Sequence, residues 1–418
     1  MRTRPRVLLS SYQCGPGMGS VSQIGWNWYR LLSERLPVSL VTHIRNRGAL
    51  TSAGAPLPGS EVVYIDTEWL AKPLYTVTRL LFRSSEHAVF LFSSFDYFVY
   101  DRAAWRMLKR GGQCAGEWNI IHIPTPVSPW AATLLHRLGP PVILGPWNGG
   151  LASPANFPEI MRADAAWTYP IRNLGRLVNT WRKSTHNAAR ILVANRSTRA
   201  AIPVRDQDRC LTMLENAVDT EVFQPVPYPH PPSTTSPLKV VFIGRLVPFK
   251  GVSMLLEAVE RFRGHCPIEA TVVGEGPLEA SLHREAASRN IQTSVRFVGK
   301  KDQKGVVEEI GRAHLFCLPS VRESGGAVVL EAMACARPVV AVAYGGPAEL
   351  VDESVGRALP PNGREAVVQG LLATFSDLLE SPKKWEARGL NGRQRVLERH
   401  TWRAKIDAVL DIYGEMLP

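Results

Sequence analysis

One alternating pattern occurs twice in this chain, on either side of a proline-rich break, and it constrains the fold more than any other feature. Short runs rich in β-branched residues alternate with longer amphipathic segments in both halves. Such alternation is typical of a parallel sheet covered by helices, so we expect an α/β protein with two domains. The expected strands are residues 7–10, 38–42, 120–123, 142–144 and 190–194, then 239–243, 269–273, 295–298, 315–318 and 338–341.

The break lies between Gln224 and Pro237, where six prolines alternate with small or polar residues. This composition is typical of a linker. We therefore assign residues 1–219 to an N-terminal domain, 220–237 to the linker and 238–400 to a C-terminal domain. The last segment, residues 401–418, carries an apolar helical stripe. It could cap the C-terminal domain, but we assign it to the N-terminal domain.

Length and charge limit the function classes. The 418 residues are too many for a single small binding module, and 49 basic against 37 acidic residues give a net charge of +12. That charge favours anionic partners such as nucleotides, phosphorylated lipids, acidic membranes or nucleic acid. No basic repeat, zinc spacing or RNA-binding aromatic motif indicates nucleic acid, so we expect none as a partner.

Targeting signals and metal-binding patterns are missing from the sequence. No secretory signal follows the arginines at positions 2, 4 and 6, and no run reaches the roughly 20 apolar residues that span a bilayer. The six cysteines form no CxxC pair, which argues against a zinc site. We expect a cytoplasmic protein with reduced cysteines, with association on the cytoplasmic face of a membrane left open.

The most informative motif follows the expected strand 315–318. The turn Pro319 to Gly326 leads into a helix that starts at Ala327. Unpaired backbone N–H groups of Ser324, Gly325, Gly326 and Ala327, at the positive end of the helix dipole, would form a cradle for a phosphate. Two carboxylates, Glu323 and Glu331, bracket this cradle. The alternative is structural: Glu323 caps the helix and Glu331 forms a surface ion pair.

A second anion site is indicated by residues 244–251, which again follow a strand and open a helix. Gly244 permits a close turn, while Arg245 offers a planar fork and Lys250 a point charge to phosphate oxygens. A third turn begins at Gly274. Alone it is weak evidence, because turns between strands and helices use glycine for geometry.

Three features of the N-terminal half are also candidates. The loop after the first strand is rich in glycine, and Gly17 and Gly19 are its expected close-approach positions. A second rim, Asn148 and Gly149, follows the strand 142–144 and is our candidate for binding the acceptor. Trp147 beside it could stack on a sugar, but packing is the favoured interpretation. His122 is expected at the carboxyl end of a strand, where a lone histidine is more often structural. Three further polar groups, Asp96, His43 and Glu117, fit no pattern.

In the second half the motifs resemble those of retaining GT-B glycosyltransferases of family four, also called glycosyl transferases group 1. That family carries Gly-Arg-Leu-x-x-x-Lys-Gly, Gly-x-Gly-Pro, Glu-x7-Glu with Ala-Met-Ala, Pro-Val-Val and Gly-Gly motifs in this order. They stand here at 244–251, 274–277, 323–334, 338–340 and 345–346. Asn216-Ala217-Val218-Asp219 resembles the family's Asn-Gly-Val-Asp, with Ala217 in place of the usual glycine.

The resemblance implies the GT-B fold, two Rossmann-like domains facing across a cleft, and transfer of a sugar from a nucleotide-diphosphate sugar to an acceptor hydroxyl with retention. It implies that Arg245 and Lys250 hold the diphosphate, that Glu331 binds the ribose, and that Glu323 contacts the sugar. It also favours a donor-sugar contact by His122, which we therefore assign to the catalytic residues with Glu323, Arg245 and Lys250. The loop of Gly17 and Gly19 resembles the family's flexible donor and acceptor loop, so we assign both glycines to the donor site. No DxD-type motif stands out in the second half, so we expect neither a metal nor another cofactor. Hydrolysis or phosphorolysis of the same donor and non-catalytic sugar-nucleotide binding are the alternatives.

A basic segment lies in the first half, where residues 162–209 hold ten basic and three acidic residues. A solvated surface is the simplest interpretation. The alternatives are docking on an anionic bilayer, at about 1 kcal/mol per basic residue, or binding of a phosphorylated acceptor.

Overall fold

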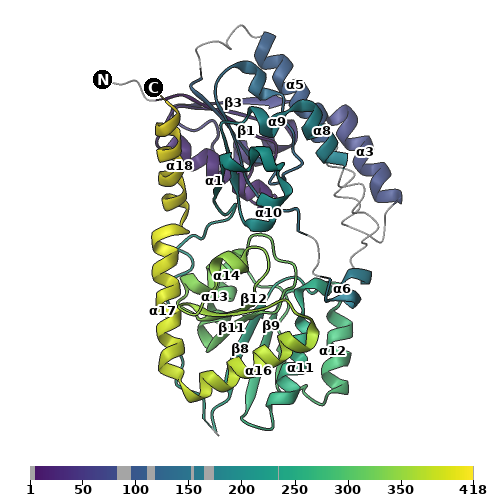
Figure 1. Ribbon diagram of the computed structural model, residues 1–418, viewed down its shortest axis with the longest axis vertical. Helices are drawn as coiled ribbons and strands as arrows, with labels where there is room; N and C mark the ends of the chain where they lie inside the picture. Colours follow the sequence, from purple (N-terminus) through teal and green to yellow (C-terminus); the bar gives the residue numbers. More distant parts are fainter. Residues whose placement is uncertain are drawn as a thin grey trace. The chain divides into compact units, whose positions relative to one another are not determined.

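The computed structural model describes residues 5–81, 96–110, 118–151, 155–163, 174–233 and 235–417. The chain divides into two compact units. The first consists of Met1–Gly150, Ala165–Glu215 and Lys405–Pro418, and the second of Leu151–Asp164 and Asn216–Ala404. Each unit is built around its own parallel sheet (Figure 1).

The first unit contains a seven-stranded sheet in the order β3-β2-β1-β4-β5-β6-β7. Every strand pair within it is parallel. Its elements are β1 (Val7–Ser11), α1 (Ser20–Ser33), β2 (Val38–His43), η1 (Ile44–Asn46), α2 (Arg47–Ser52), β3 (Ser60–Ile65), α3 (Glu68–Leu81), α5 (Asp96–Arg110), β4 (Ile120–Thr125), η2 (Leu135–Leu138), β5 (Val142–Trp147), α8 (Leu174–Arg182), α9 (Ser184–Asn187), β6 (Arg190–Val193), α10 (Arg196–Ala201), η4 (Val204–Arg209) and β7 (Cys210–Thr212).

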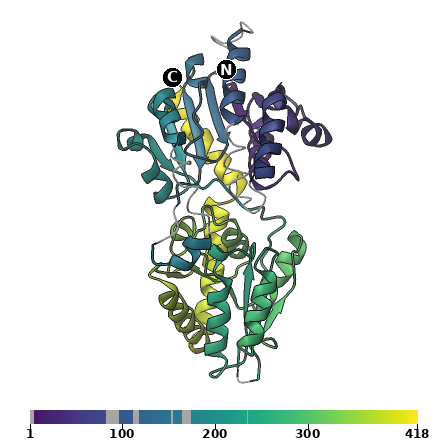
Figure 2. The same cartoon turned by 90° about the vertical axis from the view of Figure 1, so that its right-hand side faces the viewer.

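Helices cover both faces of this sheet because its central strands are apolar on both sides. On one face, Ile121 of β4 packs in a cluster with Tyr97 and Tyr100 of α5. On the other face, the next residue of β4, His122, contacts Trp28 of α1 and Tyr413 of α18 (Trp402–Met416). From Lys405 onward α18 therefore belongs to the first unit (Figure 2).

The second unit contains a six-stranded parallel sheet in the order β10-β9-β8-β11-β12-β13. With the sheet of the first unit, it establishes the expected α/β class with two Rossmann-like units. Its elements are α6 (Pro158–Ala163), β8 (Leu238–Ile243), η5 (Pro248–Lys250), α11 (Val252–Phe262), β9 (Ile268–Val273), α12 (Glu279–Ser288), β10 (Val295–Phe297), α13 (Gln303–Arg312), β11 (Leu315–Leu318), α14 (Ala327–Ala334), β12 (Val339–Val342), α15 (Pro347–Leu350), β13 (Gly356–Leu359), α16 (Arg364–Glu380) and α17 (Pro382–Arg399).

Two segments pack differently from the domain limits drawn on the sequence. Residues 151–164 belong to the second unit, where the Asn156 amide donates to the Pro361 carbonyl at 3.3 Å. The proline-rich residues 220–237 also pack on the second unit. The buried guanidinium of Arg337 donates to the carbonyls of Val226 and Pro227 at 3.0 and 2.7 Å. These backbone oxygens thus accept hydrogen bonds from a charged side chain that lies about 110 residues further along the chain.

In the part of the chain that the structure describes, no helix is both long enough and apolar enough to cross a membrane.

Candidate functional site

The strand order of the second unit fixes where a ligand site is expected. Successive strands run outward from β8 to β10, and the chain then returns to β11 on the other side of β8. In open parallel sheets, ligands bind at the carboxyl ends of the two strands where the order reverses. Here those strands are β8 and β11, and each is followed by a glycine-containing turn that the sequence analysis singled out.

The turn after β8 presents two cationic side chains. Arg245 is exposed, and the aliphatic stem of Lys250 passes Gly244, where a Cβ would lie 3.8 Å from Lys250 Cδ. Gly251 adopts a left-handed φ of 70°, and a Cβ there would come within 2.2 Å of the Pro319 carbonyl oxygen. Gly251, the residue directly before α11, is therefore in close contact with the turn after β11, and only glycine fits there.

The turn that begins at Gly274 supports the first turn through backbone contacts. The Gly244 N–H donates to the Val273 carbonyl at 3.0 Å, and the Leu246 N–H donates to the Glu275 carbonyl at 2.9 Å. A Cβ on Gly274 would meet the Gly244 oxygen at 1.9 Å, and its φ is 136°. Only glycine at position 274 therefore allows its backbone to lie this close to the backbone of Gly244.

The turn after β11 is bound to the turn after β8 through Phe249. The Phe249 carbonyl accepts hydrogen bonds from the Ser320 hydroxyl at 3.1 Å and from the Val321 N–H at 2.9 Å. Sequence reasoning did not assign a role to Ser320. Its position directly after a buried strand is a signal, but serine is common in turns for other reasons.

The carboxylate of Glu323 and the ammonium of Lys250 form an ion pair. Both side chains are about 15% exposed, so the pair is shielded but accessible. The other carboxylate oxygen, Oε1, lies 3.4 Å from the Gly326 N–H, a long contact across the start of α14. Two residues predicted separately for the site are therefore in direct contact, and Glu323 does not form the helix cap of the alternative interpretation.

Glu323 is fixed by the glycine pair after β12. The Gly346 N–H donates to the Glu323 carbonyl at 2.9 Å, and a Cβ on Gly345 would lie 2.0 Å from the same oxygen. Gly345 and Gly346 belong to the motif pattern, but the sequence analysis gave them no place in the site. The structure shows that they position the loop of Glu323.

The first turn of α14 provides backbone donors. Gly326, with φ 66°, precedes the helix, and no side chain caps it. Within the described residues, no protein acceptor contacts the N–H groups of Ala327 and Val328. Gly325 and Gly326 are buried, whereas Ser324 and Ala327 are partly exposed. This helix start lies where the sequence predicted the phosphate cradle. An anion there would accept hydrogen bonds from the free N–H groups.

Glu331 lies one turn further along α14 and is partly exposed. Burial raises the pKa of its carboxyl group to about 7. In the described part of the chain no ion pair reaches Glu331, so the surface ion pair of the alternative interpretation does not form. A half-buried carboxyl group without a protein partner is suited to accept hydrogen bonds from ligand hydroxyls.

In the first unit, the glycine-rich loop follows β1 as expected. Gly17 and Gly19 are exposed and have φ values of 74° and 105°. A Cβ at either position would meet no atom within 4 Å, so backbone conformation alone calls for glycine there. Gly19 directly precedes α1, which has no side-chain cap.

His122 occupies a different place from the one expected. It is the third residue of β4, not its carboxyl end, and it is fully buried. Its Nδ1 lies 2.7 Å from the Tyr413 hydroxyl and its Nε2 lies 2.7 Å from the Gly145 carbonyl oxygen. Burial lowers the pKa of the imidazole to about 4. Both ring nitrogens are used within the first unit, so we correct the catalytic assignment of His122 to a structural one.

Asn148 and Gly149 follow β5 and are partly exposed. The Asn148 amide donates to the buried carboxylate of Glu215, and the Gly149 carbonyl accepts from Thr198 Oγ1 at 2.9 Å. Trp147 is buried, in agreement with the packing interpretation. The side chain of Asn148 is therefore held by the protein, and contact of these two residues with an acceptor stays a prediction.

The basic segment 162–209 lies partly outside the described residues. In its described part, Arg182 is buried and forms an ion pair of 2.7 Å with Asp101, so it cannot face a bilayer. Arg209 donates to the Thr185 carbonyl at 3.2 Å. By contrast, Trp181 is 75% exposed. Some basic side chains of this segment therefore bind other residues of the protein.

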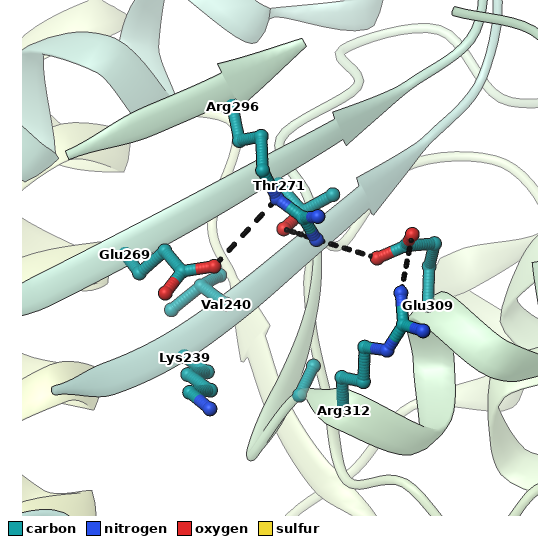
Figure 3. A pocket seen from close by; sticks show the side chains of 8 residues that line it. Lys239, Val240, Glu269, Thr271, Arg296, Glu309 and Arg312 are labelled. Atoms are coloured by element: carbon teal, nitrogen blue, oxygen red, sulfur yellow. Dashed lines mark hydrogen bonds and ion pairs between the residues drawn. The ribbon is translucent and has the colours of Figure 1, made fainter. Parts of the chain in front are cut away.

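A hollow of about 230 Å³ lies at the opposite edge of the second sheet (Figure 3). Lys239, Glu269 and Arg296, each the second residue of its strand, line it together with residues of α13. Arg296 Nη2 lies 2.8 Å from Glu309 Oε2, and Arg312 Nη1 lies 2.9 Å from Glu309 Oε1. Because this hollow is at the amino ends of the strands, it is separate from the predicted phosphate cradle. Among the described residues, no three His, Cys, Asp or Glu side chains gather as a metal site would require.

Comparisons with known proteins agree with these features. Residues 230–395 match the family model of glycosyl transferases group 1. The chain is 29% identical over 205 residues to a glycogen synthase of Mycobacterium tuberculosis, which covers 49% of this chain and 48% of that protein. It is 31% identical over 231 residues to an alpha-maltose-1-phosphate synthase of Mycolicibacterium smegmatis, over 51% of this chain and 59% of that protein. The chain thus spans about half the length of the curated relatives it matches.

The fold is similar to that of solved structures along nearly the whole chain. Anabaena Alr3699/HepE in complex with UDP matches with a TM-score of 0.63 and 15% identity, over 98% of this chain and all of that chain. At this identity the match establishes the fold alone. Residues 230–395 are thus similar to the glycosyl transferases group 1 family, and the two Rossmann-like units of the chain are those of the GT-B fold.

Proposed function

We propose that this protein is a glycosyltransferase that moves a sugar from a nucleotide-diphosphate sugar to an acceptor hydroxyl. The observation that carries the proposal is the pairing of Lys250 with Glu323 where the turns after β8 and β11 meet. A cation, a carboxylate and free N–H groups are thereby brought to the expected ligand edge of the second sheet. The relatives named as synthases support a transfer reaction, and the UDP complex of the Anabaena protein supports a nucleotide donor.

In the proposed reaction, the bond between the anomeric carbon and the diphosphate breaks and a bond to the acceptor oxygen forms on the same face of the sugar. The leaving phosphate oxygen takes the proton of the acceptor hydroxyl. Negative charge grows on the diphosphate as the first bond breaks, and Arg245, Lys250 and the N–H groups at the start of α14 are placed to stabilise it. Because these groups supply the positive charge, we propose that the transfer needs no metal ion.

The remaining carboxylates have separate roles in this proposal. Glu331 accepts hydrogen bonds from the ribose hydroxyls, and Glu323 binds hydroxyls of the transferred sugar after Lys250 turns to the diphosphate. Acceptor specificity is assigned to the first unit. Neither the nucleobase nor the sugar follows from the described side chains.

Incubation with labelled nucleotide sugars tests the proposal. A transferase forms labelled product only when an acceptor is present. Release of free labelled sugar without an acceptor would indicate a hydrolase, phosphate-dependent release of sugar phosphate would indicate a phosphorylase, and binding without turnover would indicate a sugar-nucleotide-binding protein. Each of these three results contradicts the proposal.

We further propose contact with an anionic bilayer through the segment 162–209, supported by its charge and by the exposed Trp181. Binding to phosphatidylserine vesicles should fall steeply with salt, because screening weakens surface charge interactions. Binding that does not change between low and high salt would contradict this contact.

A further inference from the structure

A mixed cluster of charged and polar side chains lies at the carboxyl edge of the first sheet. Tyr12 follows β1, His43 ends β2, and Glu68 begins α3 shortly after β3. These three strands are neighbours in the order β3-β2-β1. The cluster therefore occupies the edge of the first sheet where parallel sheets bind ligands. Two of its members, His43 and Asp96, fitted no pattern in the sequence. A third such residue, Glu117, lies outside the described residues.

Arg45 connects the members of the cluster. Its Nη2 donates to Asp96 Oδ2 at 2.9 Å, and the Tyr12 hydroxyl donates to the same oxygen. Arg45 Nε donates to His43 Nδ1 at 3.0 Å and to Glu68 Oε1 at 3.2 Å. Because His43 Nδ1 accepts hydrogen bonds from Arg45, the hydrogen of the neutral ring is on Nε2, which donates to Thr67 Oγ1 at 3.0 Å. The guanidinium is thus held in one orientation by several fixed partners.

The cluster is buried at its inner end and open at its outer end. The Asp96 side chain is 4% exposed, whereas those of Arg45 and Glu68 are each 38% exposed. Within the described residues, Arg45 Nη1 and Glu68 Oε2 carry no contact. A donor and an acceptor fixed side by side suit a hydroxyl group, which accepts from the first and donates to the second.

A hollow of about 550 Å³ begins at the same Glu68 and continues along α3. Its lining residues recur with helical spacing and form one face of the helix. Trp69 is 71% exposed and Val77 is 52% exposed, so this face is largely apolar. The rise from residue 69 to residue 77 is about 12 Å. The lining residues are Glu68, Trp69, Lys72, Pro73, Thr76 and Val77.

We infer that this edge and the hollow beside it bind the acceptor, and that the acceptor is amphipathic. Its hydroxylated head, a sugar ring, lies on Arg45 and Glu68, and its apolar chain lies along Trp69, Pro73 and Val77. The inference rests on the proposed function, because it assigns the acceptor of that reaction. Glu68 belongs both to the polar cluster and to the lining of the apolar hollow. This continuity favours a single molecule with a polar head and an apolar tail. An apolar protein partner would make no use of the polar cluster.

Calorimetric titration of the full chain with dodecyl maltoside, below its critical micelle concentration, tests this inference. Maltose supplies the head alone, and dodecylphosphocholine supplies the same chain on a head without sugar. We expect measurable binding of the maltoside, at least about tenfold weaker in Trp69→Ala because apolar contact area is lost. Leu390→Ala is the control, since Leu390 is also an exposed apolar side chain but lies on α17. It should bind like the wild type.

The head group is tested separately. Glu68→Gln should weaken binding of the maltoside and leave that of dodecylphosphocholine unchanged. Equal maltoside affinity in wild type and Trp69→Ala would overturn the inference, as would equal affinity for the two dodecyl probes. Titration of nucleoside diphosphates on the same samples separates the two proposals: their failure to bind contradicts the proposed function, whereas normal nucleotide binding without the maltoside pattern contradicts the acceptor assignment alone.

Discussion

Lys250 and Glu323 are 73 residues apart in the sequence and form an ion pair in the ligand-free structure. The ammonium group comes from the turn after β8, and the carboxylate comes from the turn after β11. In the proposed complex the diphosphate would take the place of the carboxylate beside Lys250, and Glu323 would become free to bind the sugar. The pair therefore keeps the cationic group in place until the donor arrives.

Removal of the Lys250 ammonium should slow turnover strongly. We expect Lys250→Ala to lose about 2.7–4 kcal/mol of transition-state stabilisation, or roughly a hundredfold to thousandfold in kcat, because a preorganised donor to the leaving group is lost. Steady-state kinetics with a nucleotide sugar measure the effect. Lys239→Ala is the control, since Lys239 lies at the opposite edge of the same sheet. Wild-type turnover in Lys250→Ala would refute its role.

Glu331 should reduce stability at neutral pH and above. Burial raises the pKa of its carboxyl group to about 7, so between about pH 4.5 and 7 the folded state retains a proton that the unfolded chain has released. The free energy of unfolding therefore falls as pH rises through this range, by about 3 kcal/mol at most. Glu331→Gln should melt above the wild type at pH 8 and close to it at pH 4.5.

The same position should contribute to donor binding. Glu331→Ala should weaken the affinity for the nucleoside diphosphate, because the ribose hydroxyls lose their acceptor. Glu380→Gln, at an exposed position of α16, is the control and should change neither property. A Glu331→Gln variant with the pH dependence of the wild type would show that burial does not shift this carboxyl group.

His122 should contribute to acid sensitivity. Burial lowers the pKa of its imidazole to about 4, so between about pH 6.5 and 4 the unfolded chain binds a proton that the folded state does not. The free energy of unfolding therefore decreases as pH falls through this range. Melting curves should show a smaller loss from pH 6.5 to 4.5 in His122→Gln than in the wild type. His265→Gln, on the surface, should keep the wild-type slope; equal slopes in all three proteins would contradict the structural assignment of His122.

Gly274 should tolerate no side chain. In Gly274→Ala the new methyl group would meet the Gly244 carbonyl oxygen, and the residue would keep a φ of 136° that alanine rarely adopts. Strain of this kind costs about 1–3 kcal/mol before the clash is counted. Denaturant unfolding should show this loss, whereas Gly264→Ala, where a Cβ meets nothing within 4 Å, should stay within about 0.5 kcal/mol. Comparable stability of both variants would mean that the two turns do not touch.

The sequence was sufficient to predict the central strands and the glycine-containing turns after β8 and β11. Apolar runs such as residues 315–318 form strands at the expected positions, because both faces of a parallel sheet are buried. Three strands were missed. β3 contains an apolar run, residues 62–65, but it is a partly buried edge strand; β7 has only three residues, and β13 begins with a glycine and an arginine.

Contacts between distant residues could not be predicted. The sequence places His122 after two isoleucines, but nothing near it indicates that Tyr413, 291 residues later, occupies its Nδ1. Likewise, Arg45 and Asp96 meet only because β1, β2 and β3 are adjacent in the sheet. Spacing along the chain is enough to predict which residues follow a given strand. To predict which side chains from different strands meet, the order of the strands in the sheet must also be known.

A crystal structure with a bound nucleoside diphosphate, chosen by thermal-shift screening of UDP, GDP, ADP and dTDP, tests the central claim most directly. We expect the diphosphate within hydrogen-bond distance of Lys250 Nζ and of the Ala327 and Val328 N–H groups, with the contact between Lys250 and Glu323 broken. Density for the nucleotide away from the turns after β8 and β11, with that ion pair intact, would contradict the account.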